Sequence, residues 1–174
     1  MSKTFKERLK RINTFFFDVD GVFTDGSVTI FENGEQVRKM SVKDGYAVQY
    51  AVKMGYRIAI ISGGRHEGVR LRFQGLGVQD IYLGQSNKIE AYEDLLAIYE
   101  INEDEILYMG DDLPDLEVMT KVGLACCPKD AATEIREMAH YTSPFKGGQG
   151  CVRDVIEQTL KAQEKWKDTK HINW

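Results

Sequence analysis

A run of bulky apolar residues ends abruptly in two aspartates and a glycine at Phe15-Phe16-Phe17-Asp18-Val19-Asp20-Gly21. The apolar part predicts a buried strand. Successive side chains of a strand point to opposite faces, so Asp18 and Asp20 project the same way. Two neighbouring carboxylates repel each other unless a cation lies between them or one of them holds a proton. Both arrangements can move a phosphoryl group, whereas the alternative interpretation is a pair of solvated acids before a turn.

Apolar segments of strand length alternate with segments of helical periodicity along the chain. The predicted strands are 13–17, 56–61, 80–83, 105–109 and 123–127, and the predicted helices are 44–54, 67–74, 89–99, 115–122, 131–138 and 152–166. This alternation predicts an α/β fold with a doubly wound parallel sheet and helices on both faces, formed by a single domain over residues 1–174. Asp44 is the predicted N-cap of the first of these helices. Residues 167–174 are expected to form a flexible tail.

A second type of strand pair is predicted around Asn33-Gly34, because an Asn-Gly pair between two β-prone runs is a strong hairpin signal. The hairpin would occupy about residues 26–41.

The composition is that of a soluble globular protein, with 43% hydrophobic and 29% charged residues. The net charge of −4 argues against a protein dedicated to binding nucleic acid or a membrane surface. No apolar run approaches the length of a membrane-spanning helix. Cys126, Cys127 and Cys151 lack the spacing of a metal site, and we expect reduced thiols in a cytoplasmic protein.

Polar side chains follow successive predicted strands where each strand ends or the next helix begins. They lie at Asp18-Val19-Asp20, Ser62-Gly63-Gly64, Lys88 and Gly110-Asp111-Asp112-Leu113-Pro114-Asp115. Each has an ordinary explanation alone, such as a helix cap, a solvated lysine or a turn. The carboxyl ends of parallel strands meet at one edge of the sheet, so the four together predict a functional site there.

These four segments resemble the motifs of the haloacid dehalogenase-like hydrolases over nearly the whole chain. The resemblance implies that Asp18 is a nucleophile that forms an aspartyl-phosphate. Asp20 would protonate the leaving alcohol and then deprotonate the attacking water. Ser62 would donate a hydrogen bond to the phosphoryl oxygens, and Lys88 would offset their charge.

The resemblance also implies a Mg²⁺ ion. Its ligands would be the carboxylates of Asp18 and Asp111 and the backbone carbonyl of Asp20, while Asp112 and Asp115 would support these ligands or join them. Magnesium prefers oxygen ligands and keeps several waters, which agrees with a set of aspartates.

Only 41 residues separate Asp20 from Ser62 and 25 separate Ser62 from Lys88, which leaves no space for the cap domain of larger family members. A neighbouring subunit could instead close the site through the apolar hairpin. The resemblance to the capless sugar-acid phosphatases of the family implies a homotetramer. The alternative is a hairpin folded back on its own domain.

The segments Gly84–Lys88 and Gly147–Arg153 strengthen the resemblance to the capless sugar-acid phosphatases. It implies hydrolysis of a phosphorylated 2-keto-3-deoxy sugar acid, 3-deoxy-D-manno-octulosonate 8-phosphate above all, in lipopolysaccharide precursor synthesis. Gly63 and Gly64 would line the substrate site, and Arg65 would bind the carboxylate of the sugar acid.

Three alternatives stay open. The substrate could be a nononate 9-phosphate, and the chain could be a phospho-acceptor signalling domain. The Gly147–Gly150 loop could enter a neighbouring active site or form a plain turn.

Overall fold

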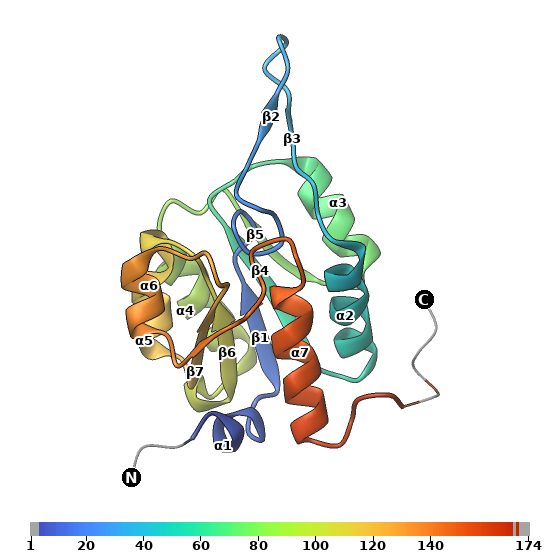
Figure 1. Cartoon of the computed structure of the whole chain (residues 1–174), viewed down its shortest axis with the longest axis vertical. Helices are drawn as coiled ribbons and strands as arrows, with labels where there is room; N and C mark the ends of the chain where they lie inside the picture. The colour runs from blue at the N-terminus through green and yellow to red at the C-terminus, as the bar shows by residue number, and fades with distance from the viewer. Residues whose placement is uncertain (1–3, 169, 171–174) are drawn as a thin grey trace.

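A six-stranded parallel sheet in the order β5-β4-β1-β6-β7-β8 forms the centre of the computed structural model, which describes residues 4–168 and 170 (Figure 1). The predicted apolar run forms β1 in the middle, hydrogen-bonded to β4 and β6. The strands are β1 (Thr14–Phe17), β4 (Arg57–Ser62), β5 (Asp80–Leu83), β6 (Ile106–Met109), β7 (Leu124–Cys127) and β8 (Tyr141–Thr142). The predicted doubly wound sheet is therefore confirmed.

Helices cover both faces of the sheet (Figure 1). Phe15 and Phe17 of β1 pack with residues of α1, α2, α3 and α7, whereas Phe16 packs on the other face with α4, α5 and α6. The alternation of β1 thus divides the core into two apolar layers. The helices are α1 (Phe5–Leu9), α2 (Val42–Lys53), α3 (Glu67–Gly75), α4 (Lys88–Tyr99), α5 (Leu116–Lys121), α6 (Thr133–Met138) and α7 (Cys151–Ala162), with short 3₁₀ turns η1 (Glu103–Glu105) and η2 (Leu113–Asp115).

The predicted hairpin is present as β2 (Thr29–Ile30) and β3 (Gln36–Val37), which project from the body of the molecule (Figure 1). Gly34 adopts φ +83°, and the Asn33 side chain accepts a hydrogen bond from the amide of Glu35, so the Asn-Gly turn chemistry is used as expected. The strands are only two residues long. No cap domain is present among the described residues.

The prediction that Asp44 is the N-cap of α2 was wrong. Ser41 caps this helix. Its hydroxyl accepts a hydrogen bond from the backbone amide of Asp44 at 3.4 Å, and the helix begins at Val42. The Asp44 carboxylate is buried and instead accepts hydrogen bonds from the backbone amides of Gly150 and Arg153, at 3.1 and 2.8 Å. Asp44 therefore satisfies the first turn of α7, more than a hundred residues further along the chain.

The ends of the chain differ from the prediction in three places. The sequence interpretation contained neither α1 nor the edge strand β8, and α7 ends at Ala162 instead of residue 166. Most of the expected flexible tail, residues 169 and 171–174, lies outside the described residues.

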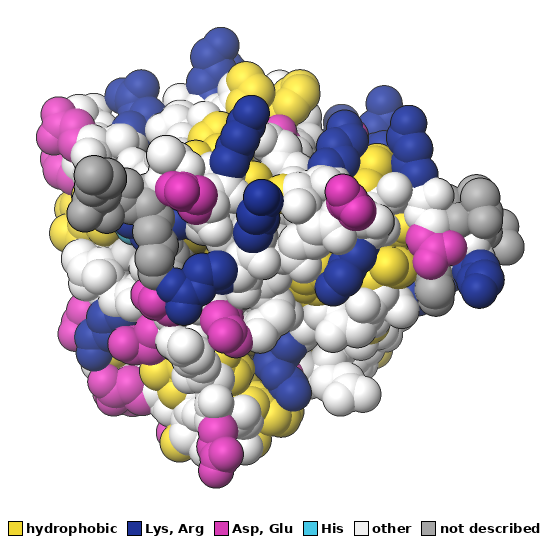
Figure 2. All heavy atoms as spheres, turned by 90° about the horizontal axis from the view of Figure 1, so that it is seen from below, with side chains coloured by type: hydrophobic (Ala, Val, Ile, Leu, Met, Phe, Trp, Pro, Cys, Tyr) yellow, Lys and Arg dark blue, Asp and Glu magenta, His cyan; other side chains and the backbone are white. Residues whose placement is uncertain are grey.

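The face opposite the hairpin carries mixed charge. Lys and Arg side chains are interspersed there with Asp and Glu (Figure 2). This face does not present the continuous basic surface with which proteins bind a nucleic-acid backbone. Within the described part of the chain, every helix is too short or too polar to cross a bilayer.

Candidate active site

The carboxyl edge of the sheet brings the predicted site residues together around an open cavity of about 440 Å³. Asp18 and Asp20 follow β1, Ser62 ends β4, and Lys88 begins α4. The lining residues are Asp18, Asp20, Gly26, Ser62, Gly63, Gly64, Gln85, Ser86, Lys88, Asp111, Asp112, Pro114 and Asp115. The four separate sequence segments thus form one site, and Arg65 is the one predicted site residue that does not line it.

Lys88 is buried between two carboxylates. Its ammonium nitrogen lies 3.0 Å from Asp18 Oδ1 and 2.6 Å from Asp115 Oδ1. All three side chains are less than a tenth exposed. Charge-assisted hydrogen bonds of this kind fix the position of both partners, so Lys88 holds the Asp18 carboxylate in one orientation.

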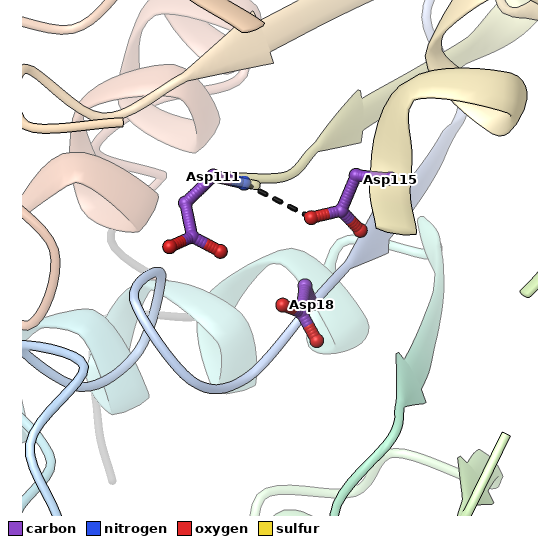
Figure 3. Close-up of side chains that lie close together, drawn as sticks. All are labelled: Asp18, Asp111 and Asp115. Carbon is purple, nitrogen blue, oxygen red and sulfur yellow. Dashed lines mark hydrogen bonds between the residues drawn. The ribbon is translucent and has the colours of Figure 1, made fainter. Parts of the chain in front are cut away.

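Asp115 lines the cavity and accepts hydrogen bonds from several other residues of the site. Its Oδ1 accepts hydrogen bonds from Lys88 and from the hydroxyl of Tyr108 at 2.5 Å, and its Oδ2 accepts the amide of Asp111 at 3.0 Å. The side chains of Asp18, Asp111 and Asp115 converge on one another (Figure 3). Because both Asp115 oxygens are already engaged, we infer that Asp115 positions Lys88 and Asp111.

The crowding of acids changes their protonation. Burial, followed by the charge of Asp115, raises the pKa of Asp18 to about 8, although Lys88 opposes the shift. Burial and Asp115 likewise raise the pKa of Asp111 to about 7. Burial lowers the pKa of Lys88, but Asp18 and Asp115 outweigh it and raise the pKa overall, so Lys88 stays charged. The cluster therefore has excess negative charge that a cation would relieve.

These residues fit a magnesium ion. Oxygens of Asp18, Asp111 and Asp115 lie within 4.8 Å of one another, and the group contains no nitrogen or sulfur ligand. Hard oxygen donors of this kind suit Mg²⁺. Both Asp115 oxygens already accept hydrogen bonds from Lys88, Tyr108 and the Asp111 amide, which leaves Asp18 and Asp111 as the candidate carboxylate ligands.

Gly21 allows this arrangement. It adopts φ +83°, and a β-carbon at this position would lie 1.9 Å from Asp111 Oδ2. The Asp111 carboxylate therefore rests directly against the backbone that follows Asp20. A side chain at residue 21 would displace one of the candidate metal ligands.

The Ser62–Gly64 turn forms the opposite wall of the cavity. The carbonyls of Ser62 and Gly64 accept the amides of Gln85 and Gly84 at 3.0 and 2.8 Å, which ties the turn to the segment before Lys88. Arg65 is exposed and packs over Gly84, where a β-carbon would lie 2.9 Å from its Cγ and Nε. The Arg65 side chain therefore lies outside the cavity, on the far side of the segment that contains Gly84.

Two residues that hydrogen-bond the predicted aspartates through their side chains, Tyr108 and Arg38, were missed by the sequence interpretation. Tyr108 is an interior residue of a predicted strand, and nothing in the sequence distinguishes it from a core aromatic. Arg38 lies next to Lys39 on the hairpin, yet its guanidinium binds Asp20 with Nε 2.7 Å from Oδ1. Arg38 differs from its neighbour only because the fold brings the end of the hairpin, just beyond β3, next to Asp20.

Comparisons with known proteins agree with this geometry. A family model described as haloacid dehalogenase-like hydrolase matches residues 70–155. The curated 3-deoxy-D-manno-octulosonate 8-phosphate phosphatase of Escherichia coli strain K12 is 38% identical over 163 residues, which cover 94% of this chain and 87% of the relative. The chain belongs to the haloacid dehalogenase-like hydrolases.

Solved structures of family members superpose on the whole fold. The crystal structure of the 3-deoxy-D-manno-octulosonate 8-phosphate phosphatase from Yersinia pestis has a TM-score of 0.92 and 37% identity, and the match covers 94% of this chain and 88% of the other. The enzyme of that name from Moraxella catarrhalis, solved with a magnesium ion, a phosphate ion and a KDO molecule, has a TM-score of 0.91 and 32% identity, with 95% of each chain covered.

Proposed function

We propose that this haloacid dehalogenase-like hydrolase is a magnesium-dependent phosphatase that converts 3-deoxy-D-manno-octulosonate 8-phosphate to 3-deoxy-D-manno-octulosonate and phosphate. The observation that carries the proposal is the buried Lys88 contact with Asp18, with Asp20 held apart on the same loop by its own partner, Arg38. This gives a nucleophile and a separate acid–base group at one cavity. The relatives of closely similar length bear the name of this activity. We expect the reaction to take place in the cytoplasm.

The reaction divides into two displacements at phosphorus. An Asp18 oxygen attacks the phosphorus, and Asp20 gives a proton to the alcohol oxygen as the bond between that oxygen and phosphorus breaks. Water then attacks the aspartyl-phosphate while Asp20 takes its proton, so phosphate leaves and the Asp18 carboxylate is restored. Lys88 and the hydroxyl of Ser62 stabilise charge on the phosphoryl oxygens in both steps.

Asp18 and Asp111 would hold the magnesium ion, together with the backbone carbonyl of Asp20, while Asp112 and Asp115 support them. When bound, the ion neutralises part of the phosphate charge and of the carboxylate cluster. Lys88 is held by Asp18 and Asp115, so it keeps its place with or without the ion.

Removal of the metal is expected to abolish phosphate release, and added Mg²⁺ should restore it. A ligand that binds only the folded protein also stabilises it, so Mg²⁺ should raise the melting temperature of metal-free protein. Phosphate release and thermal unfolding after chelation measure the two effects. Full turnover in excess chelator would contradict the proposal.

The substrate is tested with a panel of phosphate esters. Phosphate release should be fastest, by kcat/KM, for the octulosonate 8-phosphate and slower for a nononate 9-phosphate and for neutral sugar phosphates. A preference for neutral sugar phosphates would disprove the sugar-acid assignment and leave the phosphatase assignment intact. A faster reaction with the nononate would instead identify the nine-carbon acid as the substrate.

Arg65 is proposed to bind the carboxylate of the sugar acid from beyond the cavity wall, next to Gly63 and Gly64. Arg65→Ala should lower kcat/KM for the sugar acid by up to roughly 30-fold, because an exposed ion pair lies at or below the low end of the ~2–5 kcal/mol found for interface charges. Hydrolysis of p-nitrophenyl phosphate, which lacks a carboxylate, is the control and should be unchanged. Equal losses on both substrates would exclude carboxylate binding by Arg65.

A homotetramer joined through the hairpin is proposed to replace the missing cap. The hairpin exposes several large apolar side chains, which favours burial against another subunit. They are Val28, Ile30, Phe31 and Val37.

Sedimentation of the wild type should therefore give a species well above the 19.8 kDa of one chain. Ile30→Glu should dissociate it and reduce turnover, because a charge would enter the interface. Ile98→Glu on α4 is the matched control, since Ile98 is similarly exposed, 61% against 69%, but lies away from the hairpin. A fully active wild-type monomer at micromolar concentration would exclude a lid formed by a second subunit.

A further inference from the structure

Arg38 connects the hairpin to the acid–base residue. Just beyond β3, its guanidinium faces the Asp20 carboxylate edge to edge, with Nε 2.7 Å from Oδ1 and Nη2 3.1 Å from Oδ2. Two parallel hydrogen bonds between planar groups fix the orientation of the carboxylate as well as its distance. The Arg38 side chain is only 8% exposed, whereas that of Asp20 is 35% exposed and open to the cavity.

Within the described residues, the Arg38 guanidinium and the Asp20 carboxylate are found to hydrogen-bond only each other. Arg38 Nη1 is buried and has no hydrogen-bond partner in the described part of the chain. Over residues 4–168 and 170, Arg38 is also the only group found to hydrogen-bond the Asp20 carboxylate. An arginine retained for folding alone would be expected to use its remaining donor, since a buried unpaired donor is costly. The only side-chain hydrogen bonds found for Arg38 in the described part of the chain are thus the two that it donates to Asp20.

Arg38 reaches the space where the chemistry takes place. A β-carbon built on Gly64 would lie 3.6 Å from Asp20 Oδ2, 3.6 Å from Ser62 Oγ and 3.7 Å from Arg38 Nη2. The acid–base oxygen, the phosphate-binding hydroxyl and the guanidinium thus surround one small space beside Gly64. Arg38 also lines the cavity of about 740 Å³ between the hairpin and α3, so it forms part of the wall between hairpin and active site.

We propose that Arg38 is a positioning residue for leaving-group protonation, which holds the Asp20 carboxylate toward the ester oxygen of the substrate. Asp20 lies in an irregular loop after β1 and has no backbone ladder of its own to orient it. A general acid works only within hydrogen-bond reach of its target atom, so a free rotation of Asp20 would reduce the productive fraction. The proposal rests on the phosphatase function proposed above.

The dependence of the rate on the leaving group tests this role. Arg38→Met removes both hydrogen bonds and keeps an unbranched side chain in place of the aliphatic part of arginine. It should lower kcat/KM for a simple alkyl phosphate by about 10²-fold, the lower end of the range for general acid catalysis. For p-nitrophenyl phosphate it should lower kcat/KM only a few-fold, because nitrophenolate leaves without a proton. Arg38→Lys, which can restore one of the two contacts, should give an intermediate value on the alkyl ester.

Two further variants separate positioning from a structural effect. Lys39→Met removes one positive charge from the neighbouring, exposed position. It should leave kcat/KM unchanged for both esters. In an Asp20→Asn background, Arg38→Met should lower kcat/KM little further. If Arg38 acts only through Asp20, the effects of the two substitutions are not additive.

Equal losses of Arg38→Met on both esters, or full additivity with Asp20→Asn, would overturn the positioning role while the phosphatase function stands. A wild-type protein that hydrolyses neither ester with Mg²⁺ would overturn the phosphatase function, and the positioning role with it.

Discussion

Asp18→Asn is expected to abolish turnover without loss of the fold. An amide oxygen is a poor nucleophile and cannot form the acyl-phosphate, so kcat should fall by about 10⁴–10⁶-fold, as for the loss of other catalytic nucleophiles. The pKa of Asp18 is raised to about 8 in the folded protein. Asp18 therefore destabilises the fold increasingly as the pH rises above the pKa that this group has in the unfolded chain. Asparagine removes this cost, and Lys88 keeps Asp115 as its partner at 2.6 Å.

The two measurements are turnover and the melting temperature in metal-free buffer. The melting temperature of Asp18→Asn should equal or exceed that of the wild type at neutral pH. Retained turnover would remove Asp18 from the nucleophile role. A lost fold would show instead that the Asp18–Lys88 contact is structural.

Lys88→Met should reduce stability and activity together. It leaves the carboxylates of Asp18 and Asp115 buried without their cation, and breaking a buried pair costs ~3–5 kcal/mol. Proton uptake by the acids keeps the loss near the lower value, about 3 kcal/mol, which corresponds to a fall of roughly 6–12 °C in melting temperature for a chain of this size. Loss of a charge that stabilises the transition state should lower kcat by about 10²–10³-fold.

Mg²⁺ should recover part of this stability, because it supplies positive charge to the same carboxylates, and thermal unfolding with and without the metal measures it. Lys121→Met is the matched control. Lys121 pairs with Glu93 at 3.3 Å on the surface, where the two side chains are 37% and 60% exposed. Such a pair contributes about 0–1 kcal/mol. Equal destabilisation by the two substitutions would contradict the buried-charge argument.

The sequence was sufficient to predict which residues gather at one cavity wherever a polar residue type and a strand end occur together. Asp18, Ser62 and Asp111 each follow an apolar strand, and the topology of a parallel sheet then brings them to one edge. The register of β1 with β4 and β6 places Phe17 beside Ile60 and Met109, so the ends of these three strands lie level with one another at that edge.

Contacts between distant segments could not be predicted in this way. Asp44 precedes an apolar helix and has the composition of a cap, yet it caps α7 because the fold brings Gly150 and Arg153 to it. The contact of Arg38 could not be predicted either, because a hairpin sequence sets the turn but not which loop lies beside the base of the hairpin. Both contacts depend on how distant elements pack against each other, and the local propensity of a sequence segment carries no information about that packing.

The glycine loop before α7 has a consequence for how the protein folds. A β-carbon on Gly147 would lie 2.0 Å from the carbonyl oxygen of Gly21, and Cys151 Sγ lies 3.2 Å from the carbonyl oxygen of Val22, a separation of 129 positions along the chain. Contacts this distant in sequence require the closure of a very long loop and tend to form late in folding. The loop that carries Asp20 therefore acquires its final shape only after the C-terminal part of the domain has docked. A ribosome-bound fragment that already contains Asp18 and Asp20 but lacks the loop before α7 is therefore expected to have no phosphatase activity.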